Sequence, residues 1–197
     1  MDKIQLEDSQ VFKVIFLGET GIGKSSIIEK FCSHEHIQTF QTHNIEFGKR
    51  NLLFKDSELY IHFLNLIDSK KINIFKLQDI RRFFYKNVNL AIIMFDLTVP
   101  NYVETINRWT FELEREKEFF HKQFRILCLG TKADLKPKEF SDTYSETLGL
   151  KMTELSNKFN QEIFYFEVSS QDCNSCSNIM HQIEKLAEIF YDEQLYT

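Results

Sequence analysis

The stretch GETGIGKS, from Gly18 to Ser25, constrains this chain more than any other part of its sequence. It holds three of the six glycines among 197 residues. The apolar run VFKVIFLG ends at Gly18, and a run of helical period begins at Lys24. The spacing GxxxxGKS at such a junction lets backbone N–H groups wrap a polyphosphate at the amino end of a helix. The sequence therefore predicts a phosphate-binding loop between a strand and a helix.

Lys24 and Ser25 close this loop and carry its chemistry. At this spacing the lysine reaches the β- and γ-phosphates of a nucleotide, and the serine hydroxyl ligates Mg²⁺. A glycine-rich turn that matches by chance is the alternative. The strand before the motif and the helix after it argue against that alternative.

Apolar runs of strand length alternate with longer runs of helical period along most of the chain. Strands are expected at 11–18, 50–55, 59–68, 89–98, 124–130 and 163–170, and helices at 24–34, 72–87, 103–120, 145–160 and 178–193. This alternation predicts an α/β fold with a mostly parallel six-stranded sheet covered on both faces by about five helices. Residues 50–63 break the pattern as two strands joined by a polar turn at Asp56 and Ser57, which predicts one antiparallel edge strand.

Charge and cysteine content exclude several classes of function. The chain has 24 Lys plus Arg against 29 Asp plus Glu, without the basic excess that favours nucleic-acid binding. Its start, MDKIQLEDSQ, is charged, and no apolar run approaches the roughly 20 residues that cross a bilayer. Four cysteines are too few for a disulfide scaffold in a chain of this length. We therefore expect a cytoplasmic protein that does not bind nucleic acid.

The pair Cys173 and Cys176, in CNSC, leaves two interpretations open. The spacing is compatible with a zinc or redox site, but a zinc site needs further ligands and the chain has no second such pair. Residues of a loop or of a helix start are the alternative, which we favour. The dispersed histidines add no clear ligand set.

A second strand end supplies a selector for a purine base. The stretch LGTKAD, 129–134, follows the expected strand 124–130, so Asp134 is expected in the same crevice as the phosphate loop. Its carboxylate can accept two N–H bonds from guanine, whereas adenine would leave that carboxylate unpaired. The stem of Lys132 can cover the purine face. A surface loop is the alternative for so short a motif.

With these motifs in place, the chain resembles a Ras-superfamily small GTPase, most closely the Rab branch, along nearly its whole length. TKAD at 131–134 is similar to the family's NKxD motif, and EVSSQ at 167–171 is similar to ETSAK. The resemblance implies a three-layer P-loop NTPase G domain at 11–197, a single domain, after an N-terminal extension at 1–10. It also implies nucleotide contacts from Gly18, Glu19, Thr20, Gly21, Ile22, Gly23, Lys24, Ser25, Ser26, His36, Thr42, Thr131, Lys132, Asp134, Leu135, Ser169, Ser170 and Gln171.

The stretch FQTHNIEFGKR, 40–50, resembles the Rab effector loop TIGVEFG. The resemblance implies that Thr42 is the switch threonine whose hydroxyl reaches Mg²⁺, although Asn44 stands where the family has glycine. His36 falls where the family stacks a phenylalanine on the base, and an imidazole can stack there less strongly. An exposed loop histidine is the alternative.

The third motif, WDTAGQE in the family, reads IDSKKIN at 67–73. Asp68 aligns with the aspartate that holds Mg²⁺ through water. The glycine that grips the γ-phosphate falls on Lys71, and the glutamine that orients the attacking water falls on Ile72, which cannot hydrogen-bond water as an amide does. No residue is therefore assigned to catalysis. The implied metal ligands are Ser25, Thr42 and Asp68.

These motifs predict a Rab-like switch that binds GTP or GDP with Mg²⁺ and hydrolyses GTP slowly. The resemblance implies a role in vesicle trafficking. A GTP-binding interaction scaffold that hardly cycles is the alternative. A P-loop kinase for a small metabolite is disfavoured, because TKAD and the effector loop would then be coincidences.

The resemblance also implies effector, exchange and activating proteins as partners through the switch regions. Phe47 and Phe84 resemble two aromatics of the Rab effector surface, while Ile67 replaces the motif's Trp. Of the pair Phe83 and Phe84 we expect no more than one to be exposed. No cysteine follows Cys176, so no lipidation signal is present. We expect membrane association only indirectly, peripheral on endomembranes, or through a segment absent from this sequence.

Overall fold

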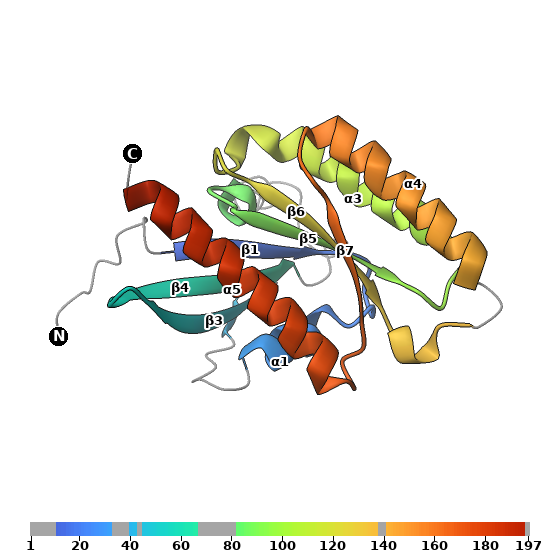
Figure 1. Cartoon of the computed structure of the whole chain (residues 1–197), viewed down its shortest axis with the longest axis horizontal. Coiled ribbons are helices and arrows are strands. Elements are labelled where there is room, and N and C mark those ends of the chain that lie inside the picture. Colours follow the sequence, from blue (N-terminus) through green and yellow to red (C-terminus); the bar gives the residue numbers. More distant parts are fainter. Residues whose placement is uncertain (1–10, 33–39, 43–44, 67–81, 138–140, 196–197) are drawn as a thin grey trace.

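Figure 1 shows the computed structural model, which describes residues 11–32, 40–42, 45–66, 82–137 and 141–195. Seven strands of this part form one sheet in the order β2-β3-β4-β1-β5-β6-β7. Their bounds are β1 (Val11–Leu17), β2 (Phe40–Thr42), β3 (Ile45–Phe54), β4 (Ser57–Leu66), β5 (Leu90–Asp96), β6 (Arg125–Thr131) and β7 (Phe164–Val168). Only β3 runs antiparallel to its neighbours β4 and β2, and the other pairings are parallel. The expected mostly parallel sheet is confirmed.

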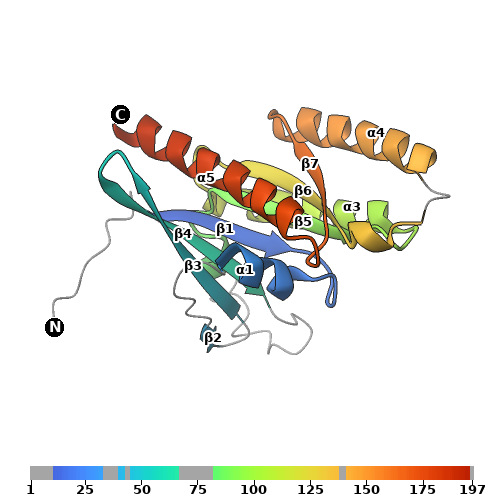
Figure 2. The ribbon, with the colours of Figure 1, turned by 60° about the horizontal axis from the view of Figure 1, so that its bottom comes forward.

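Helices cover both faces of the sheet, as Figures 1 and 2 show. They are α1 (Lys24–Cys32), α3 (Tyr102–Glu116), α4 (Ser141–Phe159) and α5 (Cys173–Leu195), with the 3-10 turns η3 (Lys117–Phe119) and η4 (Ala133–Leu135). One apolar core joins the sheet to α1 and α5, and a second joins its other face to α3 and α4. Successive β1 side chains alternate between them, with Phe16 in the first core and Ile15 and Leu17 in the second. Strand β1 therefore contributes side chains to both cores of the three-layer α/β fold.

The β3–β4 hairpin turns one residue earlier than expected. Its two central residues are Lys55 and Asp56, with φ angles of 49° and 62°. Ser57 is not in the turn but pairs with Phe54 as the first residue of β4. Two-residue hairpin turns favour left-handed backbone at both central positions because this matches the twist of the strands. The predicted turn at Asp56 and Ser57 was therefore wrong by one position.

The antiparallel edge of the sheet contains more residues than the sequence predicted. β3 begins at Ile45 rather than at residue 50, and the short β2 pairs with its first three residues. The buried carboxylate of Glu46 hides this start in the sequence, because a charged residue interrupts the apolar pattern of a strand. A seventh strand therefore joins the six expected ones.

The helices also start earlier than their periodicity indicates. α4 begins at Ser141 rather than 145, and α5 begins at Cys173 rather than 178. Residues 82–85, from the end of the expected helix 72–87, are helical, and the rest of that helix up to residue 81 lies outside the described residues. The expected extension at 1–10 lies outside them as well.

Candidate functional site

The predicted phosphate-binding loop connects β1 to α1 and requires glycine at its first position. Gly18, Gly21 and Gly23 have φ angles of 155°, 83° and 98°, which L side chains rarely adopt. A Cβ on Gly18 would lie 2.2 Å from Cδ1 of Ile22 and 2.7 Å from the carbonyl oxygen of Met94. Ile22 is itself buried, so its side chain anchors the loop in the apolar core. Thr20 and Gly21, in the middle of the loop, are exposed to solvent.

Lys24 reaches back across this loop. Its Nζ donates to the carbonyl oxygens of Gly18 at 2.9 Å and Glu19 at 2.8 Å. Burial lowers the pKa of Lys24, while the carboxylates of Glu19 and Glu46 act in the opposite direction. α1 carries no acidic residue in its first turn, so its amino end keeps the partial positive charge of a helix terminus. The loop therefore combines an ammonium with an uncompensated helix end.

Ser25 and Ser26 occupy the first turn of α1, and both are exposed. The first hydrogen bond of the helix runs from the N–H of Ile27 to the carbonyl of Gly23 at 3.0 Å. Hydroxyls at the start of a helix, beside free backbone N–H groups, are suited to an anion and its counter-cation. Both serines thus lie where the sequence predicted phosphate and metal contacts.

Glu46, which the sequence reasoning missed, approaches the loop from β3. It is buried, its Oε2 accepts a hydrogen bond from Nδ2 of Asn65 on β4 at 2.9 Å, and its charge acts on Lys24. Asn65 is the residue opposite Glu46 in the antiparallel ladder. A buried carboxylate of this kind needs such partners, because an unpaired one is costly.

The carboxyl ends of β5 and β6 lie beside each other, since Asp96 pairs with Thr131 in the parallel ladder. Nζ of Lys132 donates to Oδ2 of Asp96 at 2.6 Å, and the N–H and hydroxyl of Thr98 donate to Oδ1 at 2.8 Å and 2.6 Å. Burial acts to raise the pKa of Asp96, but these hydrogen bonds outweigh it and hold the pKa below its ordinary value. Asp96 is a second residue that the sequence reasoning missed.

The TKAD motif forms the turn after β6. Thr131 is buried and its hydroxyl donates to the carbonyl of Phe95 at 3.0 Å, while Lys132 has a left-handed φ of 58°. Asp134 and Leu135 follow in η4, and both are exposed. The motif therefore has a buried anchor in Thr131 and an exposed carboxylate in Asp134, an arrangement compatible with both the base selector and the surface loop.

The turn after β7 lies next to TKAD, because Val168 pairs with Thr131. The hydroxyl of Ser169 accepts a hydrogen bond from the N–H of Gln171 at 3.1 Å. Ser169 is buried, Ser170 is half-buried and Gln171 is exposed. The structure thus gathers the predicted contacts of this turn at the same edge as TKAD.

Asp172 ends this turn and caps α5. Its Oδ1 accepts from the N–H of Asn174 at 3.0 Å and its Oδ2 from the N–H of Ser175 at 3.2 Å. These hydrogen bonds lower the pKa of Asp172. An Asp directly before a helix is a familiar N-cap, so this missed residue carried a signal in the sequence.

The structure gives less information on the remaining predicted site residues. Thr42 lies in β2, three positions from β1 in the sheet order. His36 and Asp68 lie outside the described residues, as do Lys71 and Ile72.

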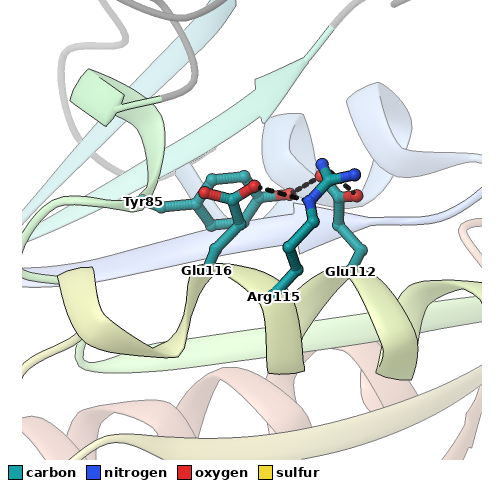
Figure 3. Close-up of polar contacts among 4 residues, drawn as sticks. All are labelled: Tyr85, Glu112, Arg115 and Glu116. Atoms are coloured by element: carbon teal, nitrogen blue, oxygen red, sulfur yellow. Dashed lines mark hydrogen bonds and ion pairs between the residues drawn. The ribbon is translucent and has the colours of Figure 1, made fainter.

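Helix α3 connects the phosphate loop to residues 82–85. Nη1 of Arg108 lies 2.5 Å from Oε1 of Glu19 in the loop. One turn further, Oε1 of Glu112 accepts from the hydroxyl of the fully buried Tyr85 at 3.0 Å. Figure 3 shows this second contact, with Arg115 bridging Glu112 and Glu116 at 3.0 Å each. The same helix therefore contacts both segments.

The aromatic residues expected on a partner surface differ in exposure. Phe83 is 62% exposed, whereas Phe84 is 0% exposed and belongs to the core. The expectation that no more than one of the two is exposed is confirmed, but the placement of Phe84 on a surface was wrong because the helix turns that side chain toward the sheet. Phe47 is half-buried against His62, with ring centroids 5.0 Å apart.

Cys173 and Cys176 both lie in the first turns of α5, which confirms their place at a helix start and leaves the redox interpretation open. Among the described residues no three His, Cys, Asp or Glu side chains are grouped as metal ligands. Within the same residues, every helix is too short or too polar to span a membrane.

Comparison with known proteins gives one consistent result. The sequence model of the Ras family matches residues 13–189. Ras-related protein RABA2a of Arabidopsis thaliana is 26% identical over 76% of this chain and 68% of its own length. RabC of Dictyostelium discoideum is 26% identical over 85% of this chain and 86% of its own length. Rab-9A of Rattus norvegicus is 26% identical over 83% of this chain and 76% of its own length.

Proposed function

Because this chain belongs to the Ras family and is a Rab-like small GTPase, we propose that it is a guanine-nucleotide-binding switch that takes GTP or GDP with Mg²⁺. We further propose that residues 11–197 act as its single G domain. The family as a whole binds guanine nucleotides, and the residue roles below extend that property to this chain.

The phosphate loop is the observation that carries the proposal. Gly18 lets the loop backbone pack closely on Ile22 and Met94, a Cβ at Gly21 or Gly23 would meet no atom within 4 Å, and two donors of the Lys24 ammonium are held by loop carbonyls. Backbone N–H groups at the start of α1 add further donors. We propose that the residues from Gly18 to Ser26 hold the α-, β- and γ-phosphates.

Guanine selection is assigned to the two turns beside that loop. Asp134 is exposed, so its carboxylate is available to accept the two N–H bonds of guanine. Lys132 and Leu135 flank it, and the turn from Ser169 to Gln171 lies beside Thr131 in the sheet. We propose that these residues enclose the base, with His36 stacking on it.

Mg²⁺ is assigned to Ser25 together with Thr42 and Asp68. The exposed hydroxyl of Ser25 at the amino end of α1 fits a ligand of this hard cation, which prefers oxygen donors. When bound, the ion would help to neutralise the negative charge of the phosphates. Thr42 and Asp68 are proposed from the sequence motifs alone.

Slow hydrolysis is the part of the proposal that rests on the third motif. Ile72 stands at the position of the water-orienting glutamine, and its side chain makes no hydrogen bond. Loss of such a residue costs a few kcal/mol of barrier height, and each ~1.4 kcal/mol is a factor of ten in rate. We expect at least a tenfold slower single-turnover hydrolysis than in glutamine-bearing relatives.

Two measurements on the purified chain test the proposal. Nucleotide extracted from it, and competition between GTP and ATP, should give guanine nucleotide, and an equal preference for ATP would contradict the base assignment. Single-turnover hydrolysis should be slow and should accelerate in Ile72→Gln. A rate already equal to that of glutamine-bearing relatives would refute the slow-hydrolysis proposal.

The alternative is a scaffold that holds GTP and hardly cycles. A switch must bind its partners with different affinity in its two nucleotide states, and a scaffold need not. We propose effector, exchange and activating proteins as the partners, a role in vesicle trafficking and peripheral association with endomembranes. Partner binding compared between the GDP and GTP-analogue states separates the two functions.

A further inference from the structure

Cys173 and Cys176 border a cavity of about 200 Å³ that the nucleotide proposal does not use. The cavity is also lined by Lys30 of α1, Arg50 of β3 and Glu184 of α5. Cys173 is exposed and Cys176 is buried, so one sulfur meets solvent and the other lies behind it. Both cysteines face the same hollow.

Their spacing along the helix is suitable for a covalent link. Residues three apart in an α-helix have Cα atoms about 5 Å apart. Disulfides in proteins join Cα atoms separated by roughly 4.4–6.8 Å. The Cα atoms therefore lie within the disulfide range, but Cβ atoms three apart on a helix are about 5–6 Å apart and a disulfide needs about 3.5–4.5 Å, so closing the bond requires a local shift in the first turn of α5.

Charges of both signs surround the two sulfurs. Lys30 and Arg50 lie on the cavity wall, where Nη2 of Arg50 is paired with Glu184 at 2.8 Å. At Cys176 the charge of Lys30 is opposed by the carboxylate of Asp172. Exchange proceeds through a thiolate and is favoured where positive charge lies near the sulfur. Burial raises the pKa of the Cys176 thiol. Because Cys173 is exposed to solvent and Cys176 is buried, Cys173 is the attacking sulfur and Cys176 the resolving one.

The buried thiol is connected to the turn after β7. Sγ of Cys176 donates to the carbonyl oxygen of Ser169 at 3.4 Å. The N–H of Asp172 donates to the same oxygen at 3.0 Å, whereas the hydroxyl of Ser175 lies closer to the carbonyl oxygen of Asp172, at 3.0 Å, than to that of Ser169, at 3.5 Å. Oxidation of Cys176 would remove its donor to the Ser169 carbonyl, because a disulfide sulfur carries no hydrogen.

We propose that Cys173 and Cys176 form a reversible disulfide in response to small disulfides such as oxidised glutathione, and that its closure loosens the Ser169 turn. The Cys173 thiolate attacks the small disulfide and releases one thiolate. The Cys176 sulfur then attacks the mixed disulfide at Cys173 and releases the second. In total the two cysteine thiols lose two electrons and two protons. The electrons and the protons are taken up by the small disulfide, which leaves as two small thiols.

The consequence for nucleotide rests on the proposed function, in which Ser169 and Ser170 line the base. Loss of one weak hydrogen bond to the Ser169 carbonyl is expected to raise the rate of GDP release about two- to fivefold. The disulfide itself does not depend on that function, so the two can be tested separately.

Mass spectrometry of the full chain treated with oxidised glutathione tests the disulfide. We expect one intramolecular bond between Cys173 and Cys176, reversed by a dithiol, while Cys32 and Cys128 remain reduced because both are buried and neither has an exposed cysteine three residues away. The Cys173→Ser variant should form no such bond. A stable mixed disulfide at Cys173, or a Cys176 that stays free, would overturn the proposal.

Release of a fluorescent GDP analogue, measured before and after oxidation, tests the coupling. We expect faster release from the oxidised chain and the same rate from treated and untreated Cys173→Ser. An oxidised chain that releases GDP at the reduced rate would overturn the coupling. A chain that binds no GDP at all would contradict the proposed function instead, and the mass result would still decide the disulfide.

Discussion

Lowering the pH from 7 to 5 is expected to destabilise this protein through His62. This residue lies in β4 opposite Lys49 of β3 and Lys13 of β1, and its ring packs edge-on against Phe47. Within the described residues, its buried Nε2 has no hydrogen-bond partner. Burial, then Lys49 and Lys13, lower the pKa of His62 from 6.5 to about 4. The folded chain therefore resists protonation at this site.

The sign and the size of the effect follow from that difference. The unfolded chain takes up a proton near pH 6.5, whereas the folded chain does so only near pH 4. The free energy of unfolding that comes from keeping His62 neutral is fully present above pH 6.5 and is lost as the pH falls toward 4. The loss between pH 7 and pH 5 is about 2 kcal/mol for the full shift, and about 1–2 kcal/mol is expected because part of the ring is screened by solvent.

Urea unfolding at pH 7, 6 and 5 measures this loss. The His62→Gln variant carries no titrating ring, so its stability should fall less between pH 7 and pH 5, by the same 1–2 kcal/mol or so. His181→Gln, which replaces an exposed histidine of α5, is the matched control and should retain the pH dependence of the unaltered chain. If His62→Gln kept the full pH dependence, the environment described for His62 would be refuted.

Three further changes test the site. Gly18→Ala should destabilise the fold by roughly 1–3 kcal/mol in urea unfolding, because its Cβ meets Met94, whereas Gly149→Ala, with open space around it, should be neutral or slightly stabilising. Asp134→Ala should abolish the preference for GTP over ATP in a competition assay without changing thermal stability, and a retained preference would contradict its role. Asp172→Ala should lower the midpoint of thermal unfolding by removing the cap of α5, and Asp172→Asn should restore most of the loss.

Local chemistry explains which parts of the site could be predicted. The glycines of GETGIGKS permit the positive φ angles that the loop requires, so the loop that starts at Gly18 is recognisable from the spacing of its glycines alone. The contact between Lys132 and Asp96 joins residues 36 positions apart, and the contact between Glu46 and Asn65 joins residues 19 apart. Such pairings depend on the strand order, which a single sequence does not specify.

Element boundaries differ from the prediction for a related reason. The start of α5 was placed late because the residues from Cys173 to Ser177 are small or polar and interrupt the apolar periodicity. Asp172 marked the true start, and the capping rule would have found it. Adjacent Phe83 and Phe84 could not be distinguished, because periodicity indicates a buried face but not which neighbour occupies it.

The short β2 has a consequence for how copies of this chain meet one another. Among the described residues it pairs with β3 only from Ile45 to Phe47, so the edge at 48–54 has no neighbouring strand there. Such an edge is a template for strand-to-strand aggregation, and positive side chains along it oppose the approach of an identical edge. Lys49 supplies such a charge, whereas Arg50 and Lys55 are paired with Glu184 and Asp192 of α5 at 2.8 Å and 2.7 Å. A neutral substitution of Lys49 is therefore expected to make concentrated samples assemble edge to edge.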